Sequence, residues 1–333
     1  MTAARLQLNR ADMDDANRIV SAMTQAFAAK VVGQQNLRES LLIGLLAGGH
    51  ILLESVPGLA KTTAARVLAE SVRGGFQRIQ CTPDLLPSDI VGTQIYEAET
   101  HSFATQLGPV HTNILLLDEI NRSSAKTQSA MLEAMEERQT TIAGTVYPIP
   151  DPFLVIATQN PVDQEGTYPL SEAQTDRFML KEVLRYPSTQ EEVEVMTRID
   201  AGVYDRSRPS RPVVALDDVR RLQAVVRSVH MDPVLMTYAS ELVAVTRNPH
   251  QFLSAQLARL IEYGASPRAT IAFCTAARAL AVLSGRGHVV PEDIGKLAHR
   301  VLRHRLILGF EAATAKVTTD DVVDAVLGAV RVP

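Results

Sequence analysis

The sequence predicts an α/β domain over residues 1–186, built on a five-stranded parallel sheet, followed by an all-helical domain over residues 187–333. Before residue 187, apolar runs of strand length alternate with helical patterns, which is typical of an open α/β sheet. Most of these runs are continuously apolar, as expected of parallel strands that are covered on both faces. After residue 187, helical patterns follow one another without a convincing strand. A chain of 333 residues is long enough for two such domains.

The individual elements are predicted from these runs in chain order. The five candidate strands are residues 50–54, 76–81, 113–118, 152–158 and 178–184. Helical segments between them include residues 61–71 and 124–137. In the second domain, the helical patterns cover residues 189–200, 216–229, 233–247, 267–284, 291–304 and 319–330. Three of these helices begin with recognisable start signals, which are Asp232-Pro233, Ser266-Pro267, and Thr319 ahead of two aspartates.

The composition limits the classes of protein that need to be considered. The net charge of −4 does not favour nonspecific binding to nucleic acid, although a local basic groove stays open. Cys81, Cys274 and the eight histidines lack metal-ligand spacing, so we predict neither a zinc site nor a disulfide framework. Charged residues between positions 10 and 15 interrupt any signal-peptide pattern, and the longest apolar run, residues 41–53, is too short to span a bilayer. We therefore expect a soluble protein of the cytoplasm.

The stretch from Ser55 to Thr62, SVPGLAKT, has the spacing of a phosphate-binding P-loop, G-x-x-x-x-G-K-[ST]. Ser55 and Ala60 stand where that pattern has its two glycines. The stretch follows the first strand and opens a helix, so backbone N–H groups and the helix N-terminus would converge on a bound phosphate. Lys61 would reach the β- and γ-phosphates, and the Thr62 hydroxyl would bind Mg²⁺. The alternative is a plain strand-to-helix connection with an exposed lysine.

A second motif ends the third predicted strand, where ILLLDEINR (residues 114–122) places two carboxylates, Asp118 and Glu119, after a buried run. The carboxyl ends of the strands form the edge at which open α/β sheets bind ligands. Asp118 would hold the Mg²⁺ shell, and Glu119 would orient and polarise the attacking water. A lone acidic pair after a strand is commonly a polar turn. A P-loop spacing followed later by an acidic pair, each at the end of a strand, is hard to obtain by chance.

With several further segments, these motifs resemble the MoxR family of AAA+ ATPases, over about residues 31–305. The segments that carry the resemblance are VVGQ (31–34), GGHILLESVPGLAKT (48–62), LLPSDIVG (85–92), GPVHTNILLLDEINR (108–122), KTQSAMLEAMEERQ (126–139), ATQNP (157–161), EAQTDRF (172–178) and GASPRA (264–269). P-loops of that family usually read G-x-P-G-x-A-K-T, so Ala60 matches them and Ser55 departs from them. The resemblance implies an AAA+ nucleotide-binding domain and a helical lid domain, with ATP or ADP and Mg²⁺ as ligands.

The resemblance also implies roles for individual residues. Val32 and Gly33 would border the adenine. Asn160 would act as sensor 1 on the attacking water or the γ-phosphate, and Arg268 as sensor 2 on the γ-phosphate bound by the same chain. Arg177 would be the arginine finger, inserted into the neighbouring subunit's site. The other nucleotide contacts would come from the loop and the first helical turn: Pro57, Gly58, Leu59, Ala60, Lys61, Thr62 and Thr63. The simpler alternatives are solvated surface charges for the two arginines and a turn that begins at Asn160.

Two segments would mark the helix-2-insert and pre-sensor-1 hairpin clade of the family. Residues 93–108 alternate around a polar centre and predict one hairpin, the helix-2 insert. Residues 139–152, with a turn at Ala143-Gly144, predict a second hairpin, the pre-sensor-1 insert. In related ATPases such hairpins face the central pore, whereas the simpler alternative is two ordinary surface hairpins.

The function implied by the resemblance is that of a hexameric ring, in which ATP hydrolysis at subunit interfaces remodels a client protein. The partner in this family is commonly a protein with a von Willebrand factor A domain, and the task is often maturation or metal-cofactor insertion. A nucleic-acid-dependent AAA+ motor is an alternative, but the acidic balance and the lack of a recognisable DNA-binding module argue against it. A nucleotide-gated scaffold with little turnover is another, and Glu119, Asn160 and Arg177 together argue against that.

Overall fold

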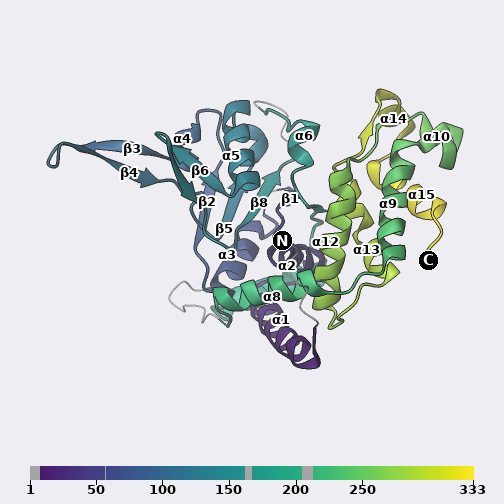
Figure 1. The fold of residues 1–333 in the computed structure, drawn as a ribbon, viewed down its shortest axis with the longest axis horizontal. Coiled ribbons are helices and arrows are strands. Elements are labelled where there is room, and N and C mark those ends of the chain that lie inside the picture. Colours follow the sequence, from purple (N-terminus) through teal and green to yellow (C-terminus); the bar gives the residue numbers. More distant parts are fainter. Residues whose placement is uncertain (1–7, 57, 162–166, 205–212) are drawn as a thin grey trace.

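The computed structural model of the protein describes residues 8–56, 58–161, 167–204 and 213–333. Figure 1 shows an α/β part and, beside it, a group of helices from the C-terminal part of the chain. The α/β part is built on five parallel strands in the order β2-β5-β8-β1-β9. These strands are β1 (Ile51–Glu54), β2 (Phe76–Gln80), β5 (Ile114–Asp118), β8 (Leu154–Gln159) and β9 (Leu180–Val183). Each coincides within two residues with one of the predicted runs, so the predicted sheet is confirmed.

The sheet is covered on both faces because side chains in a strand point to opposite faces in turn. The covering helices are α1 (Arg10–Lys30), α2 (Gln35–Ala47), α3 (Lys61–Ser71), α4 (Pro87–Val91) and α5 (Ala125–Glu137). In β5, Ile114 and Leu116 belong to the core that includes α1, α2 and α3. Leu115 and Leu117 belong to a second core, formed with α4 and α5. Burial on both faces explains why this strand is a continuous apolar run in the sequence.

The chain after β9 is largely helical, as predicted. Its helices are α7 (Thr189–Asp200), α8 (Leu216–Ser228), α9 (Pro233–Arg247), α10 (Pro249–Phe252), α11 (Ala255–Ala258), α12 (Pro267–Leu283), α13 (Pro291–Leu302), α14 (Phe310–Ala315) and α15 (Thr319–Ala329). Asp232 and Ser266 cap α9 and α12 as expected, whereas the side chain that caps α15 is Thr318 and not Thr319. None of the helices in the described ranges is both long and apolar enough to cross a membrane.

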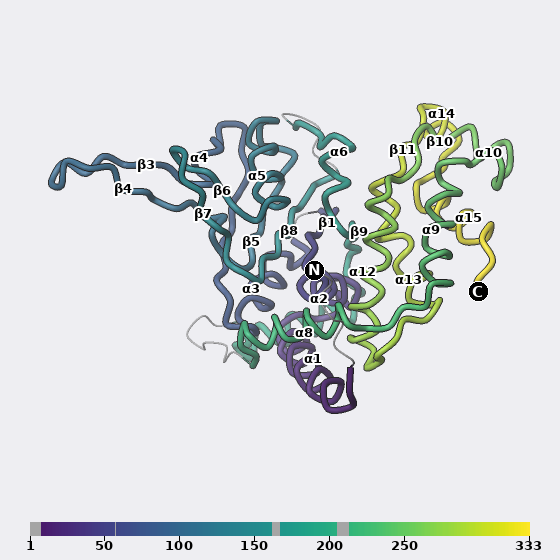
Figure 2. Tube along the Cα trace, viewed as in Figure 1, coloured from purple at the N-terminus to yellow at the C-terminus, as the bar shows by residue number. Residues whose placement is uncertain are grey.

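Three helices join the two predicted domains, because α8 packs against both α2 and α12, and α2 and α12 also pack against each other. The α1–α3 side of the sheet and the C-terminal helices consequently share one continuous apolar core. In Figure 2, the short helix α6 (Glu172–Thr175) and the edge strand β9 lie between the rest of the sheet and α12. The domain boundary near residue 187 stays a prediction.

One small sheet in the C-terminal part was not predicted from the sequence. The strand β10 (Ile261–Tyr263) pairs antiparallel with β11 (Ile307–Leu308). Strands of three and two residues are too short to produce a recognisable alternation of apolar and polar residues. Their pairing brings together segments that precede α12 and α14, and backbone bonds such as Gly309 N–H to the Leu260 carbonyl, at 2.9 Å, continue it.

Both predicted hairpins are present in the structure. The first consists of β3 (Gly92–Glu97) and β4 (Ser102–Leu107), and the second of β6 (Gln139–Ile142) and β7 (Thr145–Pro148). At the base of the first hairpin, a Cβ on Gly92 would lie 2.4 Å from a backbone oxygen, so only glycine allows these chains to approach so closely. Figure 1 shows this hairpin projecting from the α/β part on the side opposite the C-terminal helices. A pore-facing position stays a prediction.

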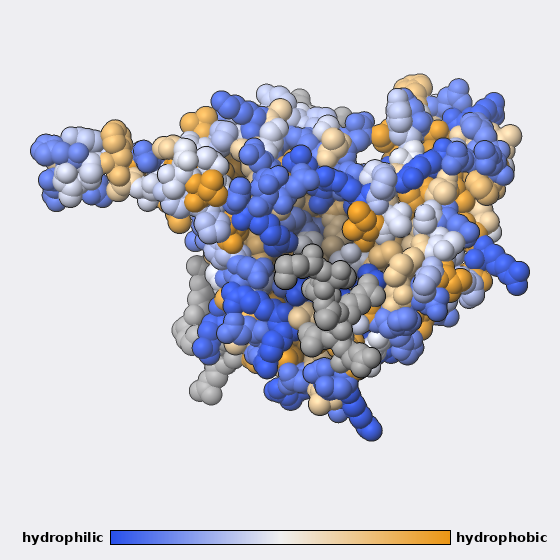
Figure 3. Space-filling model, viewed as in Figure 1, coloured by the Kyte–Doolittle hydropathy of each residue, from blue (hydrophilic) through white to orange (hydrophobic). Residues whose placement is uncertain are grey.

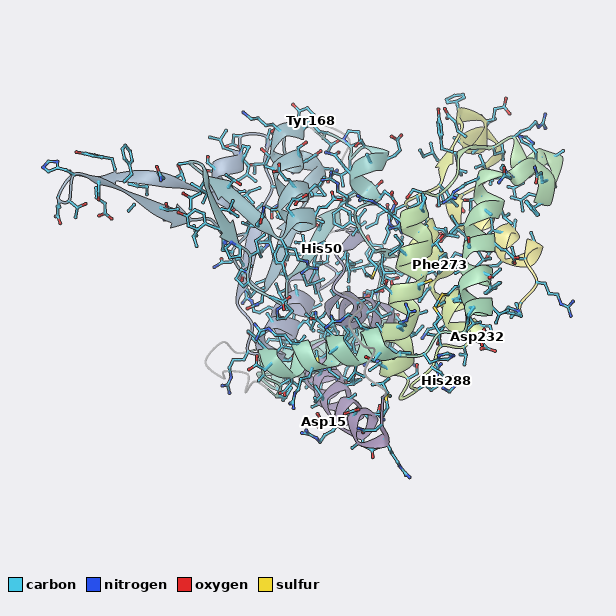
Figure 4. All side chains as sticks on the ribbon, in the orientation of Figure 1. Asp15, His50, Tyr168, Asp232, Phe273 and His288 are labelled. Atoms are coloured by element: carbon cyan, nitrogen blue, oxygen red, sulfur yellow. The ribbon has the colours of Figure 1, made fainter. Side chains whose placement is uncertain are left out.

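A buried histidine links the start of β1 to two other elements of the α/β part. His50, labelled in Figure 4, accepts a hydrogen bond at Nδ1 from the Val155 N–H (3.0 Å) and donates from Nε2 to the Met135 carbonyl (3.2 Å). Burial, together with the positive charge of Arg138, lowers the pKa of His50 from 6.5 to about 3. The folded protein therefore keeps this imidazole neutral.

This histidine is expected to make the protein less stable in mild acid. The unfolded chain binds a proton below about pH 6.5 and the folded chain does not, so stability falls as the pH falls below that value. His50 alone should remove about 2 kcal/mol of unfolding free energy between pH 7 and pH 5. Urea titrations at both pH values should show a correspondingly smaller loss for His50→Gln, whose amide keeps one donor and one acceptor. An equal loss in both proteins would contradict the assignment.

Candidate active site

The structure brings the ends of three neighbouring strands to one edge of the sheet. The strands β1, β8 and β5 lie side by side, and they are followed respectively by the loop to Lys61, by Asn160, and by Asp118-Glu119. Because parallel strands end at the same edge, these residues meet there, as the order of the motifs predicted. We call this edge, which includes the carboxyl ends of all five strands, the carboxyl edge.

The loop before α3 has the backbone geometry that a phosphate site needs. Ala60 lies in the left-handed region (φ 56°, ψ 20°), so it adopts the conformation of the glycine that it replaces. Gly58 has φ +88° with open space where a Cβ would stand, and Leu59 is buried in the core. Among the described residues, no side chain caps α3, which begins at Lys61, so the N–H groups of its first turn can bind a ligand. Pro57 lies outside the described residues.

Ser55, the other departure from the glycine pattern, continues β1 without strain. Its N–H donates to the Gln159 carbonyl (3.0 Å), its hydroxyl donates to the Val56 carbonyl (3.1 Å), and it is not among the described residues with positive φ. Ser55→Gly is therefore expected to change ATP affinity by less than about twofold, since no left-handed strain is relieved. Calorimetric titration of both proteins with ATP would check this. A tenfold gain in affinity would show that the Ser55 side chain does obstruct the loop.

The Asp118 carboxylate is held between three other side chains at the carboxyl edge. Thr158 Oγ1 donates to Asp118 Oδ1 (2.8 Å), and Lys61 Nζ lies 4.0 Å from the same oxygen. Arg78 Nη2 donates to Oδ2 at 2.7 Å. The side chains of Lys61 and Asp118 are only 10% and 11% exposed, so solvent screens their charges weakly. A lysine and a carboxylate this close can bind a phosphate and a divalent cation side by side.

Glu119 follows immediately and has an unusual backbone conformation. Its φ of 57° and ψ of 54° lie in the left-handed region, which non-glycine residues adopt mainly where surrounding contacts enforce it. The Glu119 N–H donates to Thr158 Oγ1 (2.9 Å). Its carboxylate accepts a hydrogen bond from Gln80 Nε2 (3.1 Å) and lies 3.4 Å from Arg122 Nη1. These contacts fix the backbone and the carboxylate of Glu119 beside Asp118.

Four residues of this network were not identified from the sequence: Arg122, which lies three positions after Glu119, and three residues of neighbouring strands. Thr158 bonds both acidic residues because it directly follows Ala157, which pairs with Leu117 across β8 and β5. Arg78 and Gln80 come from β2, an edge strand whose polar residues contrast with the apolar central strands. Two features of the sequence could have indicated the three strand residues. One is a hydroxyl inside an otherwise apolar strand, and the other is a pair of polar residues two positions apart at the end of an edge strand.

The predicted adenine-side residues lie at the carboxyl edge near the end of β9. Gly33 has φ +61°, a left-handed conformation that favours glycine, and it lies against the Glu191 side chain. Glu191 and Gln34 line a cavity of about 490 Å³, together with Leu184 at the end of β9. Val32 directly precedes Gly33 and is half-buried.

Three further predicted site residues lie close to the phosphate loop in the fold. Asn160 is buried after β8, and Thr62 and Thr63 are half-buried in the first turn of α3.

The two predicted arginines lie at the opposite edge of the sheet. Arg177 precedes β9, Arg268 lies in the first turn of α12, and both pair with Glu136 at the end of α5. They line a cavity of about 280 Å³ with His50 and Met179, which precede β1 and β9. We call this the amino edge. It is separated from Lys61 by at least the four residues of β1, about 13 Å.

The structure does not place Arg268 where the sequence analysis expected it, and the role of this residue stays a prediction. Arg268 was expected to contact the γ-phosphate bound by its own chain, but the structure places it at the amino edge, away from Lys61 and Asp118. The physical reason is that Ser266, which caps α12, donates a hydrogen bond to Asp176 Oδ2 (2.6 Å), just before β9. This bond anchors the start of α12 beside Arg177.

The residues of the carboxyl edge fit a nucleotide with its metal ion. The uncapped first turn of α3, the left-handed Ala60 and the Lys61 amine suit phosphate oxygens. The Thr62 hydroxyl and the Asp118 carboxylate are oxygen donors of the kind that Mg²⁺ prefers.

The fold and this site together define an AAA+ ATPase. Residues 50–180 match the family model described as "ATPase family associated with various cellular activities (AAA)", and residues 255–326 match the AAA lid domain. A crystal structure of a provisionally assigned ATPase from Cytophaga hutchinsonii superposes with a TM-score of 0.90, 43% identity and coverage of 97% of both chains.

Two curated relatives narrow the class to a family. Chaperone MoxR1 of Mycobacterium tuberculosis is 45% identical, covering 91% of this chain and 79% of the relative. Protein YeaC of Bacillus subtilis, which is uncharacterised, is 44% identical, covering 96% and 97%. The chain belongs to the MoxR family of AAA+ ATPases, whose chaperone-like members its sequence resembles.

Proposed function

We propose that this chain assembles into a ring, by family resemblance a hexamer, in which each nucleotide lies between two subunits. The observation that carries the proposal is the separation of charges within one chain. Lys61, Asp118 and Glu119 lie at the carboxyl edge, whereas Arg177 and Arg268 lie at the amino edge. A head-to-tail ring would bring the amino edge of one subunit to the carboxyl edge of the next.

Each predicted residue has a role in this arrangement. Lys61 and the N–H groups of the loop bind the phosphates, and Thr62 with Asp118 holds Mg²⁺. Glu119 orients and polarises the attacking water, with Asn160 beside it as sensor. Arg177, with Arg268, stabilises the charge that develops on the γ-phosphoryl group of the neighbouring subunit. When bound, ATP with Mg²⁺ supplies the phosphoryl group and the cation charge at this edge.

The adenine side of the nucleotide is assigned to the turn before α2. Val32 and Gly33 would border the base, next to the cavity lined by Gln34 and Glu191. Phosphate contacts are also assigned to the other predicted residues of the loop and the first helical turn, from their positions in the sequence. These residues are Pro57, Gly58, Leu59, Ala60 and Thr63.

We further propose that the ring remodels a partner protein and does not move along nucleic acid. The projecting hairpin β3–β4 exposes Ile95, Tyr96 and Phe103 by 46%, 53% and 66%, and Figure 3 shows apolar residues on it. The rings of Tyr96 and Phe103 pack edge to face with centroids 5.4 Å apart. Residues 92–107 contain two glutamates and neither lysine nor arginine, which suits apolar polypeptide and disfavours a phosphate backbone.

The more specific parts of the proposal depend on the family resemblance alone. They are a partner with a von Willebrand factor A domain, a task in maturation or metal-cofactor insertion, and a cytoplasmic location. Isolation of the protein from its native cell, followed by identification of co-purifying chains, would test the partner.

Steady-state ATP hydrolysis, measured over a range of protein concentrations with and without DNA, tests the proposed function. We expect turnover per subunit to rise with concentration as rings form, and to be unaffected by DNA. Stimulation of several-fold by DNA would favour the nucleic-acid motor instead. Tight ATP binding with negligible turnover at every concentration would favour a nucleotide-gated scaffold.

A further inference from the structure

One carboxylate, Glu136, joins the two arginines of the amino edge. Its Oε1 accepts a hydrogen bond from Arg268 Nη2 at 2.5 Å, and its Oε2 lies 3.2 Å from Arg177 Nε. Glu136 lies in the last turn of α5, whereas Arg177 precedes β9 and Arg268 opens α12. Three segments that are far apart in the sequence therefore meet at one side chain.

The backbones of the two arginines are anchored independently of Glu136. Arg305, whose side chain is 2% exposed, donates to Asp176 Oδ1 (2.7 Å), and Ser266 donates to the other Asp176 oxygen (2.6 Å). Asp176 directly precedes Arg177, and Ser266 Oγ accepts the backbone N–H of Arg268 (3.0 Å). These bonds fix where each arginine leaves the backbone, but they do not fix the long side chains that follow.

Glu136 contacts both of those side chains. The side chains of Arg177, Arg268 and Glu136 are 33%, 45% and 40% exposed. Ion pairs as exposed as these contribute little to folding stability. Two guanidinium groups that share a cavity would also repel each other without the carboxylate between them. The closest contact to Arg177 is at Nε, and a guanidinium group held there can still bind two phosphate oxygens through its two terminal nitrogens.

We propose that Glu136 is a positioning residue for catalysis in the neighbouring subunit. It holds Arg177 through Nε and Arg268 through Nη2, and so presents both cations together to the next subunit's γ-phosphate. The proposal rests on the ring arrangement proposed above. Glu136 itself touches neither substrate nor water in this arrangement, and it acts only through the two arginines.

Glu136→Ala is expected to lower kcat about tenfold, since misplacing a catalytic group by about 1 Å can cost up to 100-fold. KM for ATP should stay within about twofold, because the phosphate loop and Lys61 lie at the carboxyl edge. The melting temperature should change little, because the pairs are exposed. Glu137→Ala is the matched control: this carboxylate lies at the same helix end, is exposed, and forms neither of the two ion pairs with Arg177 and Arg268. It should retain wild-type kcat.

A mixing experiment separates positioning from a general loss of structure. Lys61→Ala subunits keep their arginines but cannot bind ATP, and Arg177→Ala subunits keep their site but lack the arginine. A mixture of the two should regain turnover. Adding Glu136→Ala to the Lys61→Ala subunits should remove most of that turnover. Adding Glu136→Ala to the Arg177→Ala subunits should leave it nearly unchanged, because those subunits supply the site and not the arginine at the active interface.

The results of these experiments can refute the role of Glu136 and the proposed ring separately. If the first mixture is inactive although both variants assemble, the ring arrangement fails and the role of Glu136 fails with it. If the mixture is active and Glu136→Ala has no effect in either subunit, only the role of Glu136 is overturned. A rise in kcat for Glu136→Ala would also overturn it, because the carboxylate would then be a restraint on the arginines and not a support.

Discussion

Glu119→Gln is expected to bind ATP with nearly wild-type affinity and to hydrolyse it at least about 100-fold more slowly. The amide keeps the size and shape of the side chain, so the hydrogen bond from Gln80 and the bond from the Glu119 N–H to Thr158 can persist. What is lost is the negative charge that polarises the attacking water. Lys61, Thr62 and the loop N–H groups, which bind the nucleotide, are unchanged.

Two measurements on one protein preparation check this prediction. Binding of a fluorescent ATP analogue should give similar affinity for Glu119→Gln and wild type, while phosphate release should show the loss of turnover. Lys61→Ala is the matched control, because it removes the cation that contacts the phosphates and should lose binding itself. Turnover within threefold of wild type for Glu119→Gln would remove Glu119 from the catalytic machinery.

The parts of the fold that were predictable are those with a strong local pattern. The strands β5 and β8 are buried on both faces, so each begins with an apolar run, residues 114–117 and 154–157. The helices α9 and α12 begin with a capping residue followed by proline, which is readable without any tertiary information. The pairing of β10 with β11 was not predictable, because it joins segments of three and two residues about 45 positions apart.

The residues of the candidate site also divide into those that the sequence predicts and those that only the structure identifies. The Lys61 loop and Asp118-Glu119 are contiguous motifs, and the rule that strand ends converge on one edge placed them together. Thr158 and Arg78 meet Asp118 only through strand pairing, 40 positions away in each case. The placement of Arg268 depends on the Ser266–Asp176 bond, which spans 90 positions and leaves no periodicity in the sequence. Contacts of this kind require the assembled structure.

Arg177→Ala is expected to bind ATP normally and to lose turnover by about 10³-fold or more, the effect of removing an arginine that acts in trans. Hydrolysis spreads negative charge over the γ-phosphoryl oxygens. Of the residues predicted to contact the nucleotide, Lys61 is the cation that the same chain places at the carboxyl edge. Arg177 lies at the amino edge, one residue after Asp176, so in the proposed ring it would face the neighbouring subunit's nucleotide and not its own.

Complementation between two inactive variants tests the in-trans role most directly. In rings formed at random from equal amounts of Arg177→Ala and Lys61→Ala, about a quarter of the interfaces would combine an intact site with an intact arginine. If interfaces act independently, the mixture should therefore reach about a quarter of wild-type turnover, although each variant alone is inactive. Dilution should abolish this activity as rings dissociate. Turnover proportional to protein concentration at every dilution, with no recovery on mixing, would show instead that each chain hydrolyses ATP by itself.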